Sequence, residues 1–234
     1  MTVIDPIPPA PAQQRYPRQR YLSPAMQERR RRILAQARAL LAEGGEASFN
    51  IRELSRRAGV SSRTLYHAFG GREGILAHAI AEHIEQLGEG WASQHRGNDL
   101  DSVLAEYDAV AVEVERNAAY ITTLVALFFS PAPIAEAIAS IRALPADRIR
   151  RWLAAAPRRA LLPGFEERRI VEQHVHNELV TYRRWTLGEI ALRDLADELR
   201  LGFLATLLTV TTGTMRTGIA ARHARLCATV AGRG

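Results

Sequence analysis

The residues best suited to recognise another molecule lie between Asn50 and Phe69, in the stretch NIRELSRRAGVSSRTLYHAF. Two short segments of helical periodicity flank a turn at Gly59, and the second segment would bury Leu65 and Phe69 on one side. Its arginine, histidine, threonine and tyrosine side chains would then line the other side. An arginine fork can donate to guanine O6 and N7, and a tyrosine hydroxyl can donate to phosphate. The stretch therefore predicts a helix-turn-helix whose second helix lies in a groove of duplex DNA.

Four helices are expected to position these side chains. The boundaries of the first three are predicted from capping residues, a first-turn proline and glycines that end a helix. In chain order these are Ser23-Pro24, Gly44-Gly45, Asn50, Gly59, Ser61 and Gly70-Gly71. A longer fourth helix follows, with apolar residues at helical spacing from Ile75 to Leu87.

Beyond Gly97 the sequence has helical periodicity and no alternating pattern typical of strands. Prolines and a glycine separate predicted helices over 100–116, 118–129, 134–155, 165–187 and 192–217. Pro145 is expected to kink or split the third of these, and a last weak helix is expected to reach about residue 229. The predicted fold class is all-α.

The charge is distributed unevenly along the chain. Between Arg15 and Arg72, thirteen arginines stand against four glutamates, a net charge of +9, so the rest carries −3 of the overall +6. A basic N-terminal part joined to a mildly acidic body is typical of a nucleic-acid-binding domain on a neutral carrier. Residues 1–24 are predicted to be a flexible arm rich in proline and arginine. Its Arg15, Arg18 and Arg20 either follow DNA or belong to a solvated tail.

A membrane surface could attract the same basic region, but the chain has no run of about 18 apolar residues and no signal-peptide pattern. The single cysteine, Cys227, cannot form an internal disulfide. These observations predict a cytoplasmic protein that does not bind membranes.

From about Glu28 to Leu87 the sequence resembles the DNA-binding domain of the TetR family of regulators. The shared features are an arginine-rich first helix, the AGVS turn, the Thr-Leu-Tyr triplet at 64–66, a phenylalanine at 69 and a Gly-Gly-Arg-Glu start to the fourth helix. Ala68 departs from the family pattern, where an aromatic residue or histidine is frequent, and leaves a phosphate contact there open. Arg63 replaces a residue that is commonly small, which bears on the operator sequence.

The resemblance implies that residues 25–88 form the DNA-binding domain and that seven of them contact DNA. Arg72 would bind a phosphate, Arg52 would reach the operator from the second helix, and the rest would face it from the third. The set is Arg52, Ser62, Arg63, Thr64, Tyr66, His67 and Arg72. Structural alternatives stay open, with Tyr66 as a packing residue and Arg52, Arg56 and Arg57 as a solvated helix face.

The resemblance also implies that residues 89–234 form a helical domain for dimerisation and effector binding. The last two long helices would pack against those of a second copy as a four-helix bundle. Expected interface residues are Val171, Val175, Leu179, Leu201, Leu204 and Leu208. A symmetric dimer sets two recognition helices about 34 to 36 Å apart or more, so the operator should be roughly palindromic.

A ligand pocket in this domain is implied by the resemblance alone. Aromatic residues with a few polar groups would suit a small, largely apolar effector, although ordinary core packing explains any one of them better. The candidates are Trp91, Tyr107, Tyr120, Phe128, Trp152, His174, Asn177 and Tyr182. The predicted function is thus a transcriptional regulator, a repressor released from its operator by the effector.

The sequence bears on two other functions. An enzyme finds no support, because the chain has no phosphate-binding glycine loop and no GxSxG motif, and His174 with Glu178 offers only two weak metal ligands. No catalytic residue, metal or cofactor is therefore predicted. An architectural or nucleoid-associated DNA-binding protein without an effector would use the same helix-turn-helix and stays open as the alternative.

Overall fold

The computed structural model describes residues 23–94 and 97–233, and for residues 91–94 it describes the backbone alone. The predicted DNA contacts of Arg15, Arg18 and Arg20 lie outside these residues. The helices are α1 (Pro24–Ser48), α2 (Ile51–Ala58), α3 (Ser62–Phe69), α4 (Arg72–Gln94), α5 (Leu100–Arg116), α6 (Ala118–Phe128), α7 (Ala135–Ala155), α8 (Glu167–Thr186), α9 (Leu192–Leu208) and α10 (Gly213–Ala231), with a short 3-10 turn at Arg158–Ala160.

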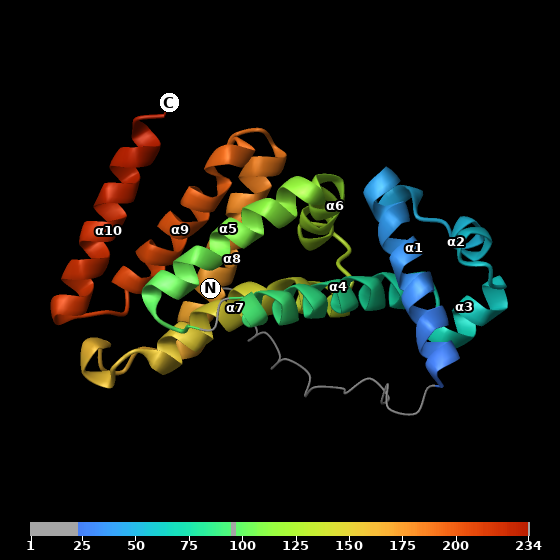
Figure 1. Ribbon diagram of the computed structural model, residues 1–234, viewed down its shortest axis with the longest axis horizontal. Helices are drawn as coiled ribbons and strands as arrows, with labels where there is room; N and C mark the ends of the chain where they lie inside the picture. Colours follow the sequence, from blue (N-terminus) through green and yellow to red (C-terminus); the bar gives the residue numbers. More distant parts are fainter. Residues whose placement is uncertain (1–22, 95–96, 234) are drawn as a thin grey trace, which may run out of the picture.

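The predicted all-α class is confirmed. Helices α1 to α3 form one end of the molecule, and α4 runs from them into the body made by α5 to α9, with α10 at the far end beside α9 (Figure 1). In the described ranges the only pairing of extended backbone is an isolated bridge between Leu161 and Thr211.

The first three helices begin where the capping residues predict, and α2 and α3 also end there, whereas α1 continues past the predicted end at Gly44-Gly45. Asn50 accepts from the backbone N–H of Arg52, and Ser61 accepts from that of Thr64, so each short helix has a side-chain cap. Gly59 ends α2 with φ of 64°, a left-handed conformation that favours glycine. Gly45, with φ of 67°, interrupts α1, and a final turn continues to Ser48.

Two predictions about the later helices are wrong. The predicted helix over 192–217 is two helices, because the hydroxyls of Thr209 and Thr211 donate to the carbonyls of the last turn of α9 and stop it. The backbone N–H of Thr212 then donates to Ala160 O at 2.9 Å, which leads the chain away from the α9 axis. The expected weak last helix is the 19-residue α10.

The helix predicted to kink or split at Pro145 runs unbroken as α7. Pro145 is buried, and α7 packs against α4 on one side and α8 on the other. This packing compensates for the hydrogen bond that the proline nitrogen cannot make.

The N-terminal helices are fastened to the body through α1 and α4. Arg38 of α1 donates to Glu82 of α4 at 2.6 Å, and the hydroxyl of Thr123 on α6 donates to Leu41 O at 3.1 Å. Between α3 and α4 the backbones approach so closely that a Cβ at Gly74 would lie 1.8 Å from Phe69 O. Only glycine therefore permits this packing.

A buried ionic cluster joins α5, α7 and α8. Arg148 is 1% exposed, and it donates to Glu178 at 2.8 and 2.9 Å and to Glu106 at 3.2 Å. Arg151 donates to the other side of Glu106 at 2.7 and 2.9 Å, so two arginines balance two glutamates. The Arg148 guanidinium also lies 4.5 Å from the centre of the Tyr107 ring.

Burial opposes the charge of Glu178, but the Arg148 guanidinium and the His174 ring outweigh it and lower the pKa of Glu178 to about 2. Because the pKa falls on folding from 4.5, the stability that this charge contributes is present above about pH 4.5 and is lost as the pH falls towards 2.

We expect Arg148→Leu to lower the free energy of unfolding by about 3–5 kcal/mol, because it leaves buried carboxylates without their cation. Urea unfolding at pH 7 measures this, and the difference from the parent should narrow as Glu178 is protonated in acid. Arg150→Leu, at an exposed position on the same helix, is the control and should change stability by less than about 0.5 kcal/mol. A similar loss in both variants would contradict a special role for the cluster.

Gly74→Ala should destabilise the protein by about 1–3 kcal/mol, since the new methyl group collides with backbone rather than with a movable side chain. Gly90→Ala in the same helix meets nothing within 4 Å and should instead stabilise by up to about 1 kcal/mol through helix propensity. Thermal unfolding of both variants tests the contrast. Equal stabilisation in the two would show that α3 and α4 are not held in this close contact.

Candidate nucleic-acid interface and ligand pocket

Helix α3 buries one side and exposes the other. Leu65 and Phe69 are 0% and 6% exposed and belong to the core. Arg63 and His67 are exposed, and Tyr66 is 56% exposed, which makes it one of the most exposed large apolar side chains of the described chain. These three predicted residues are thus exposed on α3, which lies at one end of the molecule (Figure 1).

The hydroxyl groups of the other two α3 candidates have partners within the protein. Ser62 Oγ lies 2.9 Å from Ser55 Oγ of α2, and Thr64 Oγ1 lies 2.9 Å from Ser61 Oγ of the N-cap. These contacts fix the turn between α2 and α3. Both side chains are half-buried, so they hold the recognition helix in place and retain only part of their surface for a ligand.

The arginines of α2 differ in their surroundings. Arg52 is exposed, whereas Arg57 donates to both oxygens of Glu43 at 2.5 and 2.7 Å and to Glu53 at 2.7 Å. Arg56 donates to Glu53 at 2.6 and 2.9 Å. Hydrogen bonds from Arg56 and Arg57 lower the pKa of Glu53 to about 2. Arg56 and Arg57 are therefore structural residues of the α2 surface, whereas the side chain of Arg52 is exposed.

Arg72, expected to bind a phosphate, is held by the end of α1. Its guanidinium donates to Glu46 O at 2.5 Å and to the Glu46 carboxylate at 3.1 Å, and lies 5.8 Å from the centre of the Phe49 ring. Its side chain remains 37% exposed. Arg72 therefore fixes the start of α4 against α1 and keeps one partly open side.

The arginine run at the start of α1 contains structural residues that the sequence pattern did not distinguish. The Arg30 guanidinium lies 4.8 Å from the centre of the Phe69 ring, and Arg32 donates to Ala58 O at 3.2 Å and so caps the end of α2. Arg29 and Arg31 are exposed. Half of this run therefore builds the helix-turn-helix, and the other half adds positive charge to its surface.

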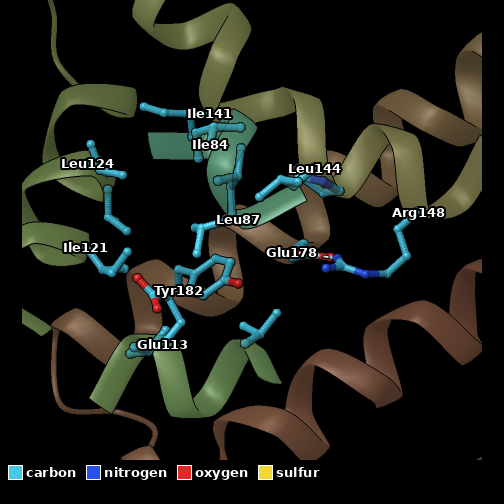
Figure 2. A pocket seen from close by; sticks show the side chains of 15 residues that line it. Ile84, Leu87, Glu113, Ile121, Leu124, Ile141, Leu144, Arg148, Glu178 and Tyr182 are labelled. Atoms are coloured by element: carbon cyan, nitrogen blue, oxygen red, sulfur yellow. Dashed lines mark hydrogen bonds and ion pairs between the residues drawn. The ribbon is translucent and has the colours of Figure 1, made fainter. Parts of the chain in front are cut away.

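A pocket opens inside the body, between α4, α5, α6, α7 and α8 (Figure 2). Aliphatic side chains form most of its wall. They include Ile84, Leu87, Ile121, Leu124, Ile141 and Leu144. Its charged and polar groups are Glu113 at one end, the Arg148–Glu178 pair at the other and Tyr182 between them (Figure 2).

The pocket is small in this conformation. Its free volume is about 70 Å³, whereas pockets that hold drug-sized ligands measure roughly 300–1,000 Å³. The α4–α7 contact contributes to this small volume, because a Cβ at Gly88 would lie 3.3 Å from Leu144 Cδ2. A sizeable ligand must therefore separate these two helices.

Of the eight predicted effector residues, the structure brings only Tyr182 to this pocket. Trp152 lines a second hollow beside α10, and the side chain of Trp91 lies outside the described part of the chain. The other five pack elsewhere in the interior: Tyr107 and His174 in the ionic cluster, Tyr120 against His83, Phe128 against Phe129, and Asn177 beside Thr206. Core packing is thus the better description of most of them.

Sequence reasoning missed the aliphatic wall of the pocket and also its charged residues. Arg148 occupies the apolar face of α7 at helical spacing from Ile141, Pro145 and Trp152. A charged residue inside an apolar stripe was the available signal, since such a residue must be paired or functional when the stripe is buried.

The expected dimer residues fall into two groups. Val171, Val175, Leu179 and Leu204 are at most 3% exposed and pack in the chain's own core, so they have no surface left for a partner. This corrects the prediction for these four, which mistook the inward stripe of each helix for the outward one. Leu201 and Leu208 are partly exposed.

Two further properties concern the described residues only. They contain no group of three or more histidine, cysteine or acidic side chains placed to hold a metal ion. None of their helices combines the length and the apolarity that a membrane span requires.

Comparison with known proteins agrees with this geometry. Residues 33–79 match the sequence pattern described as bacterial regulatory proteins, tetR family. A TetR transcriptional regulator from Rhodococcus sp. RHA1 is 19% identical with a TM-score of 0.61, over 78% of this chain and 97% of that one. Thermus thermophilus FadR, a TetR family transcriptional repressor in complex with lauroyl-CoA, is 20% identical with a TM-score of 0.60, over 76% and 93%.

A third similar structure is SmeT, the repressor of the Stenotrophomonas maltophilia multidrug efflux pump SmeDEF, which is 19% identical with a TM-score of 0.58 over 79% of this chain and 91% of that one. Comparison with curated protein sequences found no match. Residues 33–79 thus carry the sequence pattern of the tetR family of bacterial regulatory proteins, and the chain as a whole has the fold of the TetR-type regulators to which it is similar.

Proposed function

We propose that the chain is a repressor that binds a palindromic operator as a homodimer in the cytoplasm and is released by a small, largely apolar effector. The observation that carries this proposal is the exposed face of α3, where Arg63, Tyr66 and His67 have no role in the core. With Arg52 beside them on α2, these side chains offer an arginine fork for guanine and hydroxyl and ring donors for phosphate.

Dimerisation is supported by apolar side chains that are exposed or partly exposed around α8 and α9. Val180 of α8 and Leu187, which directly follows α8, are 47% and 57% exposed, and the partly exposed Leu201 and Leu208 lie seven residues apart on one face of α9. Exposed apolar surface of this kind marks interaction sites. Two copies joined here would present two α3 helices to successive turns of DNA.

Release by an effector is supported by the course of α4. Its first turn contacts α3 at Gly74, and its middle residues Ile84 and Leu87 line the pocket. A ligand that enlarges the pocket displaces α4, and with it the recognition helix. Regulation then requires that the effector bind the displaced arrangement more tightly than the DNA-bound one. The complex of the similar FadR with lauroyl-CoA supports an effector with a long apolar part.

Genome-wide footprinting with the purified full chain tests the proposal. One or a few palindromic sites, from which an apolar compound releases the protein, are the expected result. Broad coverage without a preferred sequence would favour the architectural DNA-binding protein instead. Sites that lack two-fold symmetry would contradict binding as a symmetric dimer.

Arg52→Ala, Arg63→Ala and Tyr66→Phe should each weaken operator binding by about 1–3 kcal/mol without changing the oligomeric state. Electrophoretic mobility shifts measure the affinity, and light scattering measures the mass. Arg150→Ala removes one exposed arginine from the body and serves as the matched control. Loss of dimerisation with unchanged DNA affinity in the α3 variants would contradict the assignment.

A further inference from the structure

Glu113 of α5 is a carboxylate in the wall of an otherwise aliphatic end of the pocket (Figure 2). Its side chain is 17% exposed. Asn117 donates to Glu113 Oε1 at 2.8 Å, and His83 Nε2 lies 3.4 Å from the same oxygen. Burial raises the pKa of Glu113, and the hydrogen bond from Asn117 and the charge of Arg116 offset only part of this. The fold therefore keeps an acidic group where its charge is poorly solvated.

No described arginine lies within ion-pair distance of Glu113. The only basic group at that distance is His83, and burial together with the charge of Arg38 lowers the pKa of His83 to about 4. At neutral pH this ring is therefore uncharged and gives Glu113 no counter-ion. Arg38 itself is paired with Glu82 at 2.6 Å.

The opposite end of the pocket is electrically balanced. Arg148 donates to Glu178 and to Glu106, so the guanidinium already has two carboxylates. An anionic ligand would have to compete with both of them while it approached the uncompensated Glu113. A neutral ligand would cover Glu113 and remove its remaining solvent, which costs free energy. A cation, by contrast, would supply the missing counter-ion.

We propose that the effector is a lipophilic cation, a protonated amine with an apolar body, whose nitrogen lies against the Glu113 carboxylate. This inference rests on the proposed function, since it names the chemistry of the ligand that releases the DNA. The apolar body lies among Ile84, Leu124 and Leu144, and its volume separates α4 from α7. The Tyr182 ring, between the two polar ends, offers the cation a π-face beside the carboxylate (Figure 2).

Three probes that share an octyl tail and differ in head group test the inference: octylammonium, octanol and octanoate. Calorimetry measures their binding to the full chain at pH 7. Octylammonium should bind at least about ten-fold more tightly than octanoate, as expected for a partly desolvated charge pair. Glu113→Gln should abolish that preference without lowering the melting temperature, because it removes a charge that burial disfavours. Glu115→Gln, an exposed position two residues away, should keep the preference.

Equal binding of the three probes, tighter binding of octanoate, an unchanged preference in Glu113→Gln or no binding of any probe would each overturn the inference. Leu144→Trp, which fills the pocket, should abolish binding of octylammonium, and retained affinity would place the amine elsewhere. Release of operator DNA is measured separately. Amine binding at Glu113 without release would contradict the proposed regulation and leave the ligand chemistry intact, whereas release by octanoate alone would contradict only the ligand chemistry.

Discussion

The contact between the α3 carbonyl at Phe69 and the α-carbon of Gly74 joins the recognition helix rigidly to a helix that also forms a wall of the pocket. Without a side chain at Gly74, α4 approaches closely enough for α3 to follow its direction. The Arg38–Glu82 pair adds a second attachment through α1. Under the proposed function, an effector that enlarges the pocket would tilt the end formed by α1 to α3, because close-packed helices move as bodies and do not deform continuously.

The placement of charge follows a common pattern at both ends of the molecule. Arg57 and Arg148 are each shared between two glutamates, and both serve to hold helices together. Arg63 on α3 and Glu113 in the pocket are not shared between charged partners in this way among the described residues. A buried charge without a counter-ion lowers stability, and it is retained most readily where a ligand supplies the opposite charge.

The sequence predicted the helix-turn-helix well because its boundaries depend on local chemistry: an asparagine, two serines and a left-handed glycine act within three or four residues. Features that depend on contacts between residues far apart in the sequence could not be predicted from local chemistry. The direction of the chain after α9 depends on the pairing of Thr212 with Ala160, and the burial of Arg148 depends on carboxylates 30 and 42 residues away. Aromatic residues predicted the effector site and apolar residues at helical spacing predicted the dimer interface. Neither feature distinguishes the inner face of a helix from the outer.

Helix α10 contributes a single fully enclosed side chain, Ile219, to the core, and its other contacts are partly exposed apolar groups and ion pairs such as Arg222 with Asp101. The free energy that holds it is thus a small part of the total, so it can open while α9 stays folded. Its amide hydrogens should therefore exchange with solvent long before those of α9. Evolution can alter or lengthen this C-terminal segment at little thermodynamic cost, and new regulatory contacts are most easily acquired there.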